Sequence, residues 1–66
     1  MQVTVDVKGE AETEVDAPVD ATYADLLAAV DLSPHEVTVL VDGRPVPEDQ
    51  PVSVDHVTVL RLVKGG

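Results

Sequence analysis

The chain has 66 residues and a mass of 7.0 kDa, enough for one small domain, and this size excludes most enzymes. It contains no cysteine, which excludes disulfides, thiolate metal sites and thiol nucleophiles. Thirteen acidic residues against four Lys and Arg give a net charge of −9, which excludes direct binding to nucleic acid or an anionic membrane through a basic face. Residues 1–5 also lack the charged start and apolar run of a signal peptide, so we expect a cytoplasmic protein.

The apolar residues are dominated by valine, which occupies fifteen positions, while Ile, Phe and Trp are absent. A core of Val, Leu and Ala favours a sheet, because β-branched side chains pack well on a pleated surface. The acidic surface carries only two lysines, and this balance is typical of a halophilic protein, since the Debye length falls from about 10 Å at 0.1 M salt to about 3 Å at 1 M. We expect three glutamates to share one strand face and to repel one another at low salt: Glu10, Glu12 and Glu14.

The first third of the chain predicts a hairpin. Residues 3–7 alternate between valine and polar side chains, which is typical of a strand with one buried face. A turn at Gly9 and Glu10 leads to a weaker alternation over residues 13–19, which predicts the second arm. We expect its inward side to consist of Val15, Ala17 and Val19. Pro18 makes this arm an edge strand.

A short helix is predicted next, over residues 23–30. Thr22 followed by Asp25 resembles a capping box, and the apolar residues that follow have helical spacing. Residues 33–36 read Ser-Pro-His-Glu, which predicts a cap and a single further turn.

The second half predicts three strands. Residues 37–41 alternate, and Asp42-Gly43 is a strong hairpin dipeptide. Because prolines flank Val46, the returning segment is expected to be a short edge strand followed by a loop. The alternation resumes over residues 57–63.

These elements predict an α+β fold with the order ββαβ(β)β, in which one helix packs across one face of a mixed sheet of four to five strands. The two terminal strands are the most apolar, so we expect them to form the central pair. This topology is the β-grasp. The domain is expected to span residues 1–63, with residues 64–66 as a flexible tail.

One face of the predicted sheet is a candidate docking surface. If the odd-numbered valines of the third and last strands face the helix, the leucines between them face outward. The expected patch consists of Leu40, Leu60 and Leu62. Single exposed leucines are also common without a function, so the residues alone leave both interpretations open.

Familiar catalytic and metal motifs are absent from the sequence. His35 and His56 lack the spacing of a zinc signature, and no Asp-rich calcium loop is present. The two serines have no nucleophile context. We therefore expect no catalytic residue, no metal site and no bound cofactor.

The chain end carries the one unusual chemical feature, Lys64-Gly65-Gly66. A carboxylate is a poor electrophile until an enzyme converts it to an acyl-adenylate, after which an amine, a thiol or a sulfide can attack it. Glycine suits this role because it has no Cβ, so the tail can thread a narrow active-site channel. An incidental or frayed terminus is the alternative.

Three stretches carry a resemblance to a known family: Tyr-Ala-Asp-Leu at 23–26, Leu-Ser-Pro-His-Glu-Val-Thr-Val-Leu-Val-Asp-Gly-Arg-Pro-Val-Pro-Glu-Asp-Gln at 32–50, and Leu-Arg-Leu-Val-Lys-Gly-Gly at 60–66. With the β-grasp pattern, they make the whole chain resemble the ubiquitin-like small archaeal modifier proteins, which are related to ubiquitin and to the sulfur carriers of molybdopterin and thiamine synthesis. A haloarchaeal member would account for the acidic surface.

The resemblance implies that an activating enzyme, of the type that serves ubiquitin and these sulfur carriers, adenylates Gly66 with ATP. The product is then joined to target lysines by an isopeptide bond or converted to a thiocarboxylate, which sulfur-transfer enzymes use in tRNA thiolation. The resemblance also places Leu40 and Leu60 in the recognition patch of ubiquitin, although the basic surround of that patch is missing here.

Self-conjugation could use Lys8, Lys64 or the amino terminus of a protein expected to be a monomer. Two alternatives to the modifier remain: a dedicated sulfur carrier or molybdopterin synthase small subunit, and a binding module whose glycines are incidental.

Overall fold

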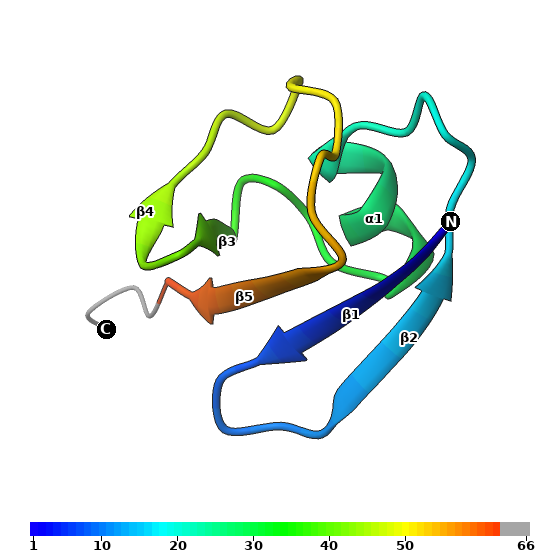
Figure 1. Ribbon diagram of the computed structural model, residues 1–66. Coiled ribbons are helices and arrows are strands. Elements are labelled where there is room, and N and C mark those ends of the chain that lie inside the picture. The colour runs from blue at the N-terminus through cyan, green and yellow to red at the C-terminus, as the bar shows by residue number, and fades with distance from the viewer. Residues whose placement is uncertain (63–66) are drawn as a thin grey trace.

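The computed structural model describes residues 1–62 and contains five strands and one helix (Figure 1). In chain order these elements are β1 (Gln2–Val7), β2 (Glu12–Asp16), α1 (Tyr23–Ala29), β3 (Val37–Val41), β4 (Arg44–Pro45) and β5 (His56–Arg61). The predicted β-grasp order of elements is confirmed. Within the described residues, no helix has the length and hydropathy needed to cross a membrane.

The five strands form one mixed sheet in the order β2-β1-β5-β3-β4. The first and last strands lie side by side near its centre and are parallel, with Thr4 opposite His56 and Val7 opposite Val59 (Figure 1). The other pairs are antiparallel. The predicted central pairing of the terminal strands is therefore confirmed.

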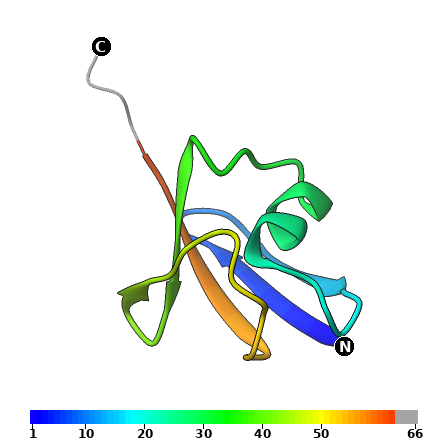
Figure 2. The same cartoon turned by 90° about the horizontal axis from the view of Figure 1, so that it is seen from above.

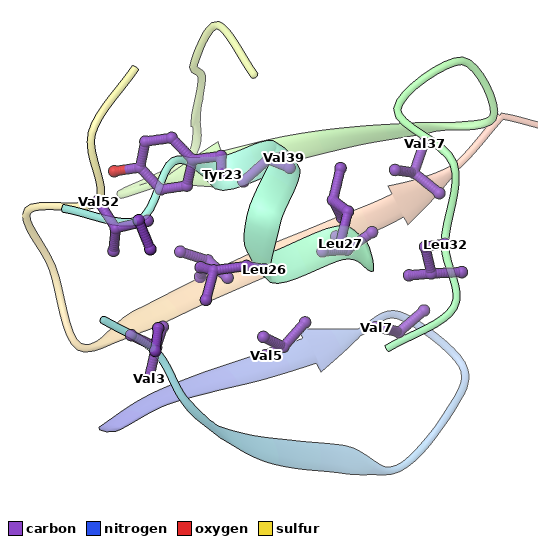
Figure 3. Packing of buried hydrophobic residues seen from close by; sticks show 14 residues of the cluster. Val3, Val5, Val7, Tyr23, Leu26, Leu27, Leu32, Val37, Val39 and Val52 are labelled. Atoms are coloured by element: carbon purple, nitrogen blue, oxygen red, sulfur yellow. The ribbon is translucent and has the colours of Figure 1, made fainter. Parts of the chain in front are cut away.

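The core lies between α1 and one face of the sheet, and Figure 2 shows the helix on that side. Leu26 and Leu27 of the helix point toward the valines of β1, and Tyr23 lies beside Val52 (Figure 3). The core residues are mostly valine, as the composition predicts: Val3, Val5, Val7, Ala17, Ala21, Tyr23, Leu26, Leu27, Leu32, Val37, Val39, Val52, Val57 and Val59. Burial of these side chains supplies the main driving force for folding.

The second arm of the first hairpin is shorter than predicted. It pairs with β1 only over Glu12–Asp16, and the chain then turns at residues 19 and 20. Ala17 is buried and Val15 half-buried, but Val19 is 84% exposed, so its predicted inward position is wrong. Pro18 explains the early end of the strand, because it has no N–H for a further rung and restricts the residue before it.

Both ends of α1 are capped. Thr22 and Asp25 form the predicted capping box: the Asp25 amide donates to Oγ1 of Thr22, and the Thr22 amide donates to the Asp25 carboxylate at 2.9 Å. The helix ends at Ala29 rather than Val30, because Asp31 adopts a left-handed conformation with φ of 59°. The amides of Asp31 and Leu32 bond back to the carbonyls of Ala28 and Leu27, the pattern of a Schellman cap that tucks Leu32 into the core.

The β3–β4 hairpin turns at Asp42 and Gly43, whose φ angles of 52° and 78° are those of a type I′ turn, as the dipeptide predicts. Strand β4 comprises only Arg44 and Pro45, directly after this turn, whereas it was predicted around Val46. The Val46 amide still donates to the Val39 carbonyl at 3.0 Å. The strand stays short because Pro45 and Pro47 supply no donors.

Strand β5 begins at His56 and ends at Arg61, so it starts one residue earlier and ends earlier than predicted. The Leu62 amide adds one further bond to the Glu36 carbonyl at 2.8 Å. Val63, the last residue of the predicted strand, lies outside the described residues.

Candidate functional site

The face of the sheet opposite α1 contains the predicted leucine patch. Strand register puts Leu40 opposite Thr58 and Leu60 opposite Thr38, so the two leucines are diagonal neighbours on β3 and β5. At this geometry the Cα atoms of diagonal residues are about 7–8 Å apart, within reach of long side chains. Leu40 is half-buried, and Leu60 is 36% exposed. The predicted outward placement of these two leucines is therefore what the structure shows.

Leu62 extends the patch along the chain direction of β5. It lies two residues beyond Leu60, its backbone remains bonded to Glu36, and the residue is 55% exposed. Pro45 is an unpredicted addition, because it pairs with Leu40 across the β3–β4 hairpin and is exposed. The two-residue turn at Asp42 and Gly43 fixes this register, so that dipeptide was the signal that could have identified Pro45. We call Leu40, Pro45, Leu60 and Leu62 the leucine patch.

The part of the same sheet face on β1 and β2 is rich in carboxylates. Each outward residue of β2 is a carboxylate, and pairing with β1 sets Glu12 opposite Asp6 and Glu14 opposite Thr4. Glu10, predicted on the same strand face, instead lies before β2. The outer surface thus has an apolar part on β3, β4 and β5 and an acidic part on β1 and β2, which favours partners that contact an apolar surface with a basic rim.

Arg61, the last residue of β5, is ion-paired with Glu10. Its Nε and Nη2 donate to the two oxygens of that carboxylate, the second at 3.3 Å. The hydrogen bond and charge of Glu10 raise the pKa of Arg61 above its ordinary value, so the guanidinium is charged at any physiological pH. This ion pair links the end of β5 to the turn between β1 and β2.

The candidate acceptor amines differ in their surroundings. Lys8 follows β1 and is exposed, with its backbone amide bonded to the Val59 carbonyl at 3.0 Å. The α-amine of Met1 donates to the Ala17 carbonyl at 2.6 Å and lies 3.7 Å from Oδ1 of Asp16. The third candidate, Lys64, and the predicted reactive residues Gly65 and Gly66 lie outside the described residues.

The two histidines lie in different settings. His35 is exposed in the turn before β3, where its backbone amide donates to Oγ of Ser33 at 3.3 Å. His56 is the first residue of β5 and lies beside the acidic part of the outer face. Its Nε2 is 3.7 Å from Oε2 of Glu12. Strand register brings Asp6 to the same place, a convergence that spacing along the sequence does not reveal.

The chain matches the family described as small archaeal modifier protein 2 over residues 1–63. It is 73% identical to the small archaeal modifier protein 2 of Haloferax volcanii over 66 residues, which cover 100% of both chains. An uncharacterised protein of Archaeoglobus fulgidus is 30% identical over 67 residues and is also fully covered.

Solved structures agree with this match. The crystal structure of the H. volcanii small archaeal modifier protein 2 superposes with a TM-score of 0.76 at 72% identity, covering 97% of each chain. The structure described as Caldiarchaeum subterraneum ubiquitin superposes with a TM-score of 0.75 at 18% identity, covering 100% of this chain and 98% of the other. The second likeness shows the ubiquitin-like β-grasp fold.

Proposed function

Because the chain belongs to the small archaeal modifier protein 2 family and is a ubiquitin-like modifier, we propose that its reactive group is the carboxylate of Gly66. An activating enzyme joins this carboxylate to the AMP moiety of ATP and releases pyrophosphate. The ε-amine of a target lysine then attacks the carbonyl carbon, loses a proton and displaces AMP, leaving an isopeptide bond. The domain acts as a substrate and as the surface that partner proteins bind, and the activating enzyme supplies the catalytic groups.

The observation that carries this proposal is the whole-length match to a modifier in a chain whose sequence ends in Lys64-Gly65-Gly66. Glycine at the reacting position leaves the carbonyl carbon open to the nucleophile, because it has no Cβ. The Arg61–Glu10 pair supports the assignment, since it anchors the chain at a residue five positions before Gly66 in the sequence.

The leucine patch is proposed as the surface that the activating enzyme and later partners contact. It joins apolar side chains from three strands next to the segment that leads to the tail. Gly66 follows Leu62 of this patch by four residues in the sequence. The sheet face beside the patch is acidic in this chain. Charge complementarity therefore predicts a partner with basic residues around its apolar contact surface.

A sulfur-transfer role is the second candidate, and it uses the same adenylate. If sulfide rather than a lysine amine displaces AMP, the product is a Gly66 thiocarboxylate, which can serve tRNA thiolation. The likeness of the chain to a protein named as a modifier favours conjugation as the first role.

For self-conjugation, Lys8 is a better acceptor than the amino terminus. A nucleophilic amine needs a free lone pair and access, and Met1 donates to Ala17 beside Asp16. Lys8 is exposed, and among residues 1–62 no carboxylate forms an ion pair with it.

Mass spectrometry of adducts tests these roles. Trypsin cuts after Lys64, so each conjugated target lysine would retain Gly65-Gly66 as a remnant. We expect these remnants in cells that express the wild-type chain and none when Gly65 and Gly66 are deleted. Lys64→Arg is the matched control, because it keeps the tail and its charge. Remnants that persist after the deletion, or that never appear with an active activating enzyme, would contradict conjugation.

The intact mass distinguishes the sulfur route, since a thiocarboxylate exchanges one oxygen for one sulfur. A thiocarboxylate without any lysine remnant would favour the dedicated carrier. Partner binding that survives the tail deletion, with neither product detected, would favour the plain binding module.

A further inference from the structure

Three potential metal ligands converge on the acidic part of the outer sheet face, away from the leucine patch. Asp6, Glu12 and His56 each offer one ligand atom, and these atoms all lie within 4.8 Å of one another. Asp6 is half-buried, while the side chains of His56 and Glu12 are 52% and 60% exposed. The group therefore combines one imidazole nitrogen with two carboxylates at a position that ions can reach.

The convergence follows from the pairing of three neighbouring strands. Glu12 of β2 lies opposite Asp6 of β1, and His56 of β5 lies opposite Thr4, two residues along β1 from Asp6. All three side chains therefore leave the same face of the sheet. Because β1 is held between β2 and β5, its backbone fixes the spacing of the ligands, and only side-chain rotation remains adjustable.

The three groups have few competing interactions. Among residues 1–62, no side-chain hydrogen bond involves Asp6, Glu12 or His56. Of the nearby cations, Arg61 is bound to Glu10, and Lys8, two residues after Asp6 in the sequence, forms no ion pair with the three groups among residues 1–62. Like charges directly opposite on an antiparallel pair destabilise a sheet, so the Asp6–Glu12 pair favours the binding of a compensating cation.

We propose that Asp6, Glu12 and His56 form a binding site for a borderline divalent transition metal ion, with Zn²⁺ as the reference ion. Zn²⁺ takes His nitrogen at about 2.0–2.1 Å and carboxylate oxygen at about 2.0–2.2 Å, which puts ligand atoms about 3.4 Å apart around a tetrahedral ion. The ligand atoms lie within 4.8 Å of one another, so side-chain rotation would have to bring them to this spacing, and water would take the fourth position.

The imidazole distinguishes this group from the other acidic residues on the same face. Glu14 and Asp16 also lie on β2, but neither belongs to the group with His56. A purely carboxylate surface attracts Mg²⁺ and K⁺ as diffuse counterions, whereas imidazole nitrogen favours Zn²⁺, Ni²⁺ or Cu²⁺ over these hard ions.

A bound ion would join β2 to β5, two strands that have no direct pairing in the sheet. Binding to the folded state alone stabilises a protein in proportion to the logarithm of ligand concentration over Kd. The site would thus fasten the edge strand β2 to the central strand β5 through a shared ion.

The test is a Zn²⁺ titration of the full chain by calorimetry at pH 7.5 in 1 M KCl. We expect one ion per chain for the wild type and at least a tenfold weaker Kd for His56→Asn. His35→Asn is the matched control, because it removes the other imidazole without touching the group. In the same way, Glu12→Gln should weaken binding while Glu14→Gln, on the same strand, should not.

Circular dichroism checks that every variant is folded. A parallel titration uses Mg²⁺ in place of Zn²⁺. Binding that distinguishes the paired variants and is absent with Mg²⁺ supports the site. Equal weakening by His35→Asn and His56→Asn, an equal affinity for Mg²⁺, or no Zn²⁺ binding in 1 M KCl would each overturn it.

Discussion

The guanidinium of Arg61 meets the carboxylate of Glu10 across 51 positions of sequence, and both planar groups use two atoms in the contact. This geometry is the strong form of an Arg–carboxylate pair. It connects the end of β5 to the turn after β1, so the base of the tail and the first hairpin are held as one unit.

Glu10→Gln should loosen this unit locally. We expect faster amide hydrogen exchange at Leu62 and in the turn at residues 8–11, because the neutral amide replaces a charged acceptor. Glu14→Gln removes the same charge, breaks no ion pair among residues 1–62, and should leave these rates unchanged. Equal exchange in the two variants would show that the pair does not anchor the chain.

Folding should depend on salt. Strands β1 and β2 carry four carboxylates on the outer face, Asp6, Glu12, Glu14 and Asp16, in a chain of net charge −9. Screening of their repulsion should raise the melting temperature between 0.1 and 2 M KCl, since the Debye length shortens to about 3 Å at 1 M. Circular dichroism against temperature measures this. An unchanged melting temperature over that range would reject the halophilic interpretation.

Leu26→Ala should destabilise the domain severely. Leu26 is 2% exposed, and truncation of such a leucine costs about 2–5 kcal/mol. A chain of 66 residues has a total stability of about 3–10 kcal/mol, so most of it would be lost. Val19→Ala, at a site 84% exposed, is the control and should have little effect in urea unfolding. Similar unfolding midpoints for both variants would contradict the placement of Leu26 in the core.

The Thr22 cap should contribute measurably to α1. Thr22→Ala removes the hydroxyl acceptor of the Asp25 amide and should cost about 1 kcal/mol, which lowers the melting temperature of a domain this small by about 4–8 °C. Thr22→Ser keeps the hydroxyl and should retain most of the stability. If serine is as damaging as alanine, the methyl group rather than the cap accounts for the effect.

Leu60→Gln should weaken binding to the activating enzyme by at least tenfold while the domain stays folded, because Leu60 is 36% exposed and contributes little to the core. Val19→Gln changes an exposed apolar residue outside the leucine patch and is the matched control. Affinity and melting temperature are measured together, so that a loss of folding is separated from a loss of docking.

The sequence predicted those elements that depend on local patterns. Alternating valines identified β1, β3 and β5, and Asp42-Gly43 identified the β3–β4 hairpin, because strand periodicity and turn conformation are set by neighbouring residues. Element ends were less accurate, since they depended on local backbone events such as the left-handed Asp31.

Contacts between distant residues could not be predicted in this way. Arg61 with Glu10 and His56 with Glu12 join residues on different strands, and their meeting depends on register across the whole sheet. The outward leucines were accessible to prediction because they follow from periodicity within one strand. The addition of Pro45 required the hairpin register as well.

The central place of β5 has a consequence for how the chain is completed. Without β5, the remaining strands would form two separate pairs, β2 with β1 and β3 with β4, and isolated two-stranded units are marginally stable in water. A chain that stops before His56 therefore lacks the strand that joins the two pairs, and it also lacks Leu60 and Leu62 of the leucine patch. A partner that recognises the complete leucine patch would therefore discriminate against chains truncated before β5.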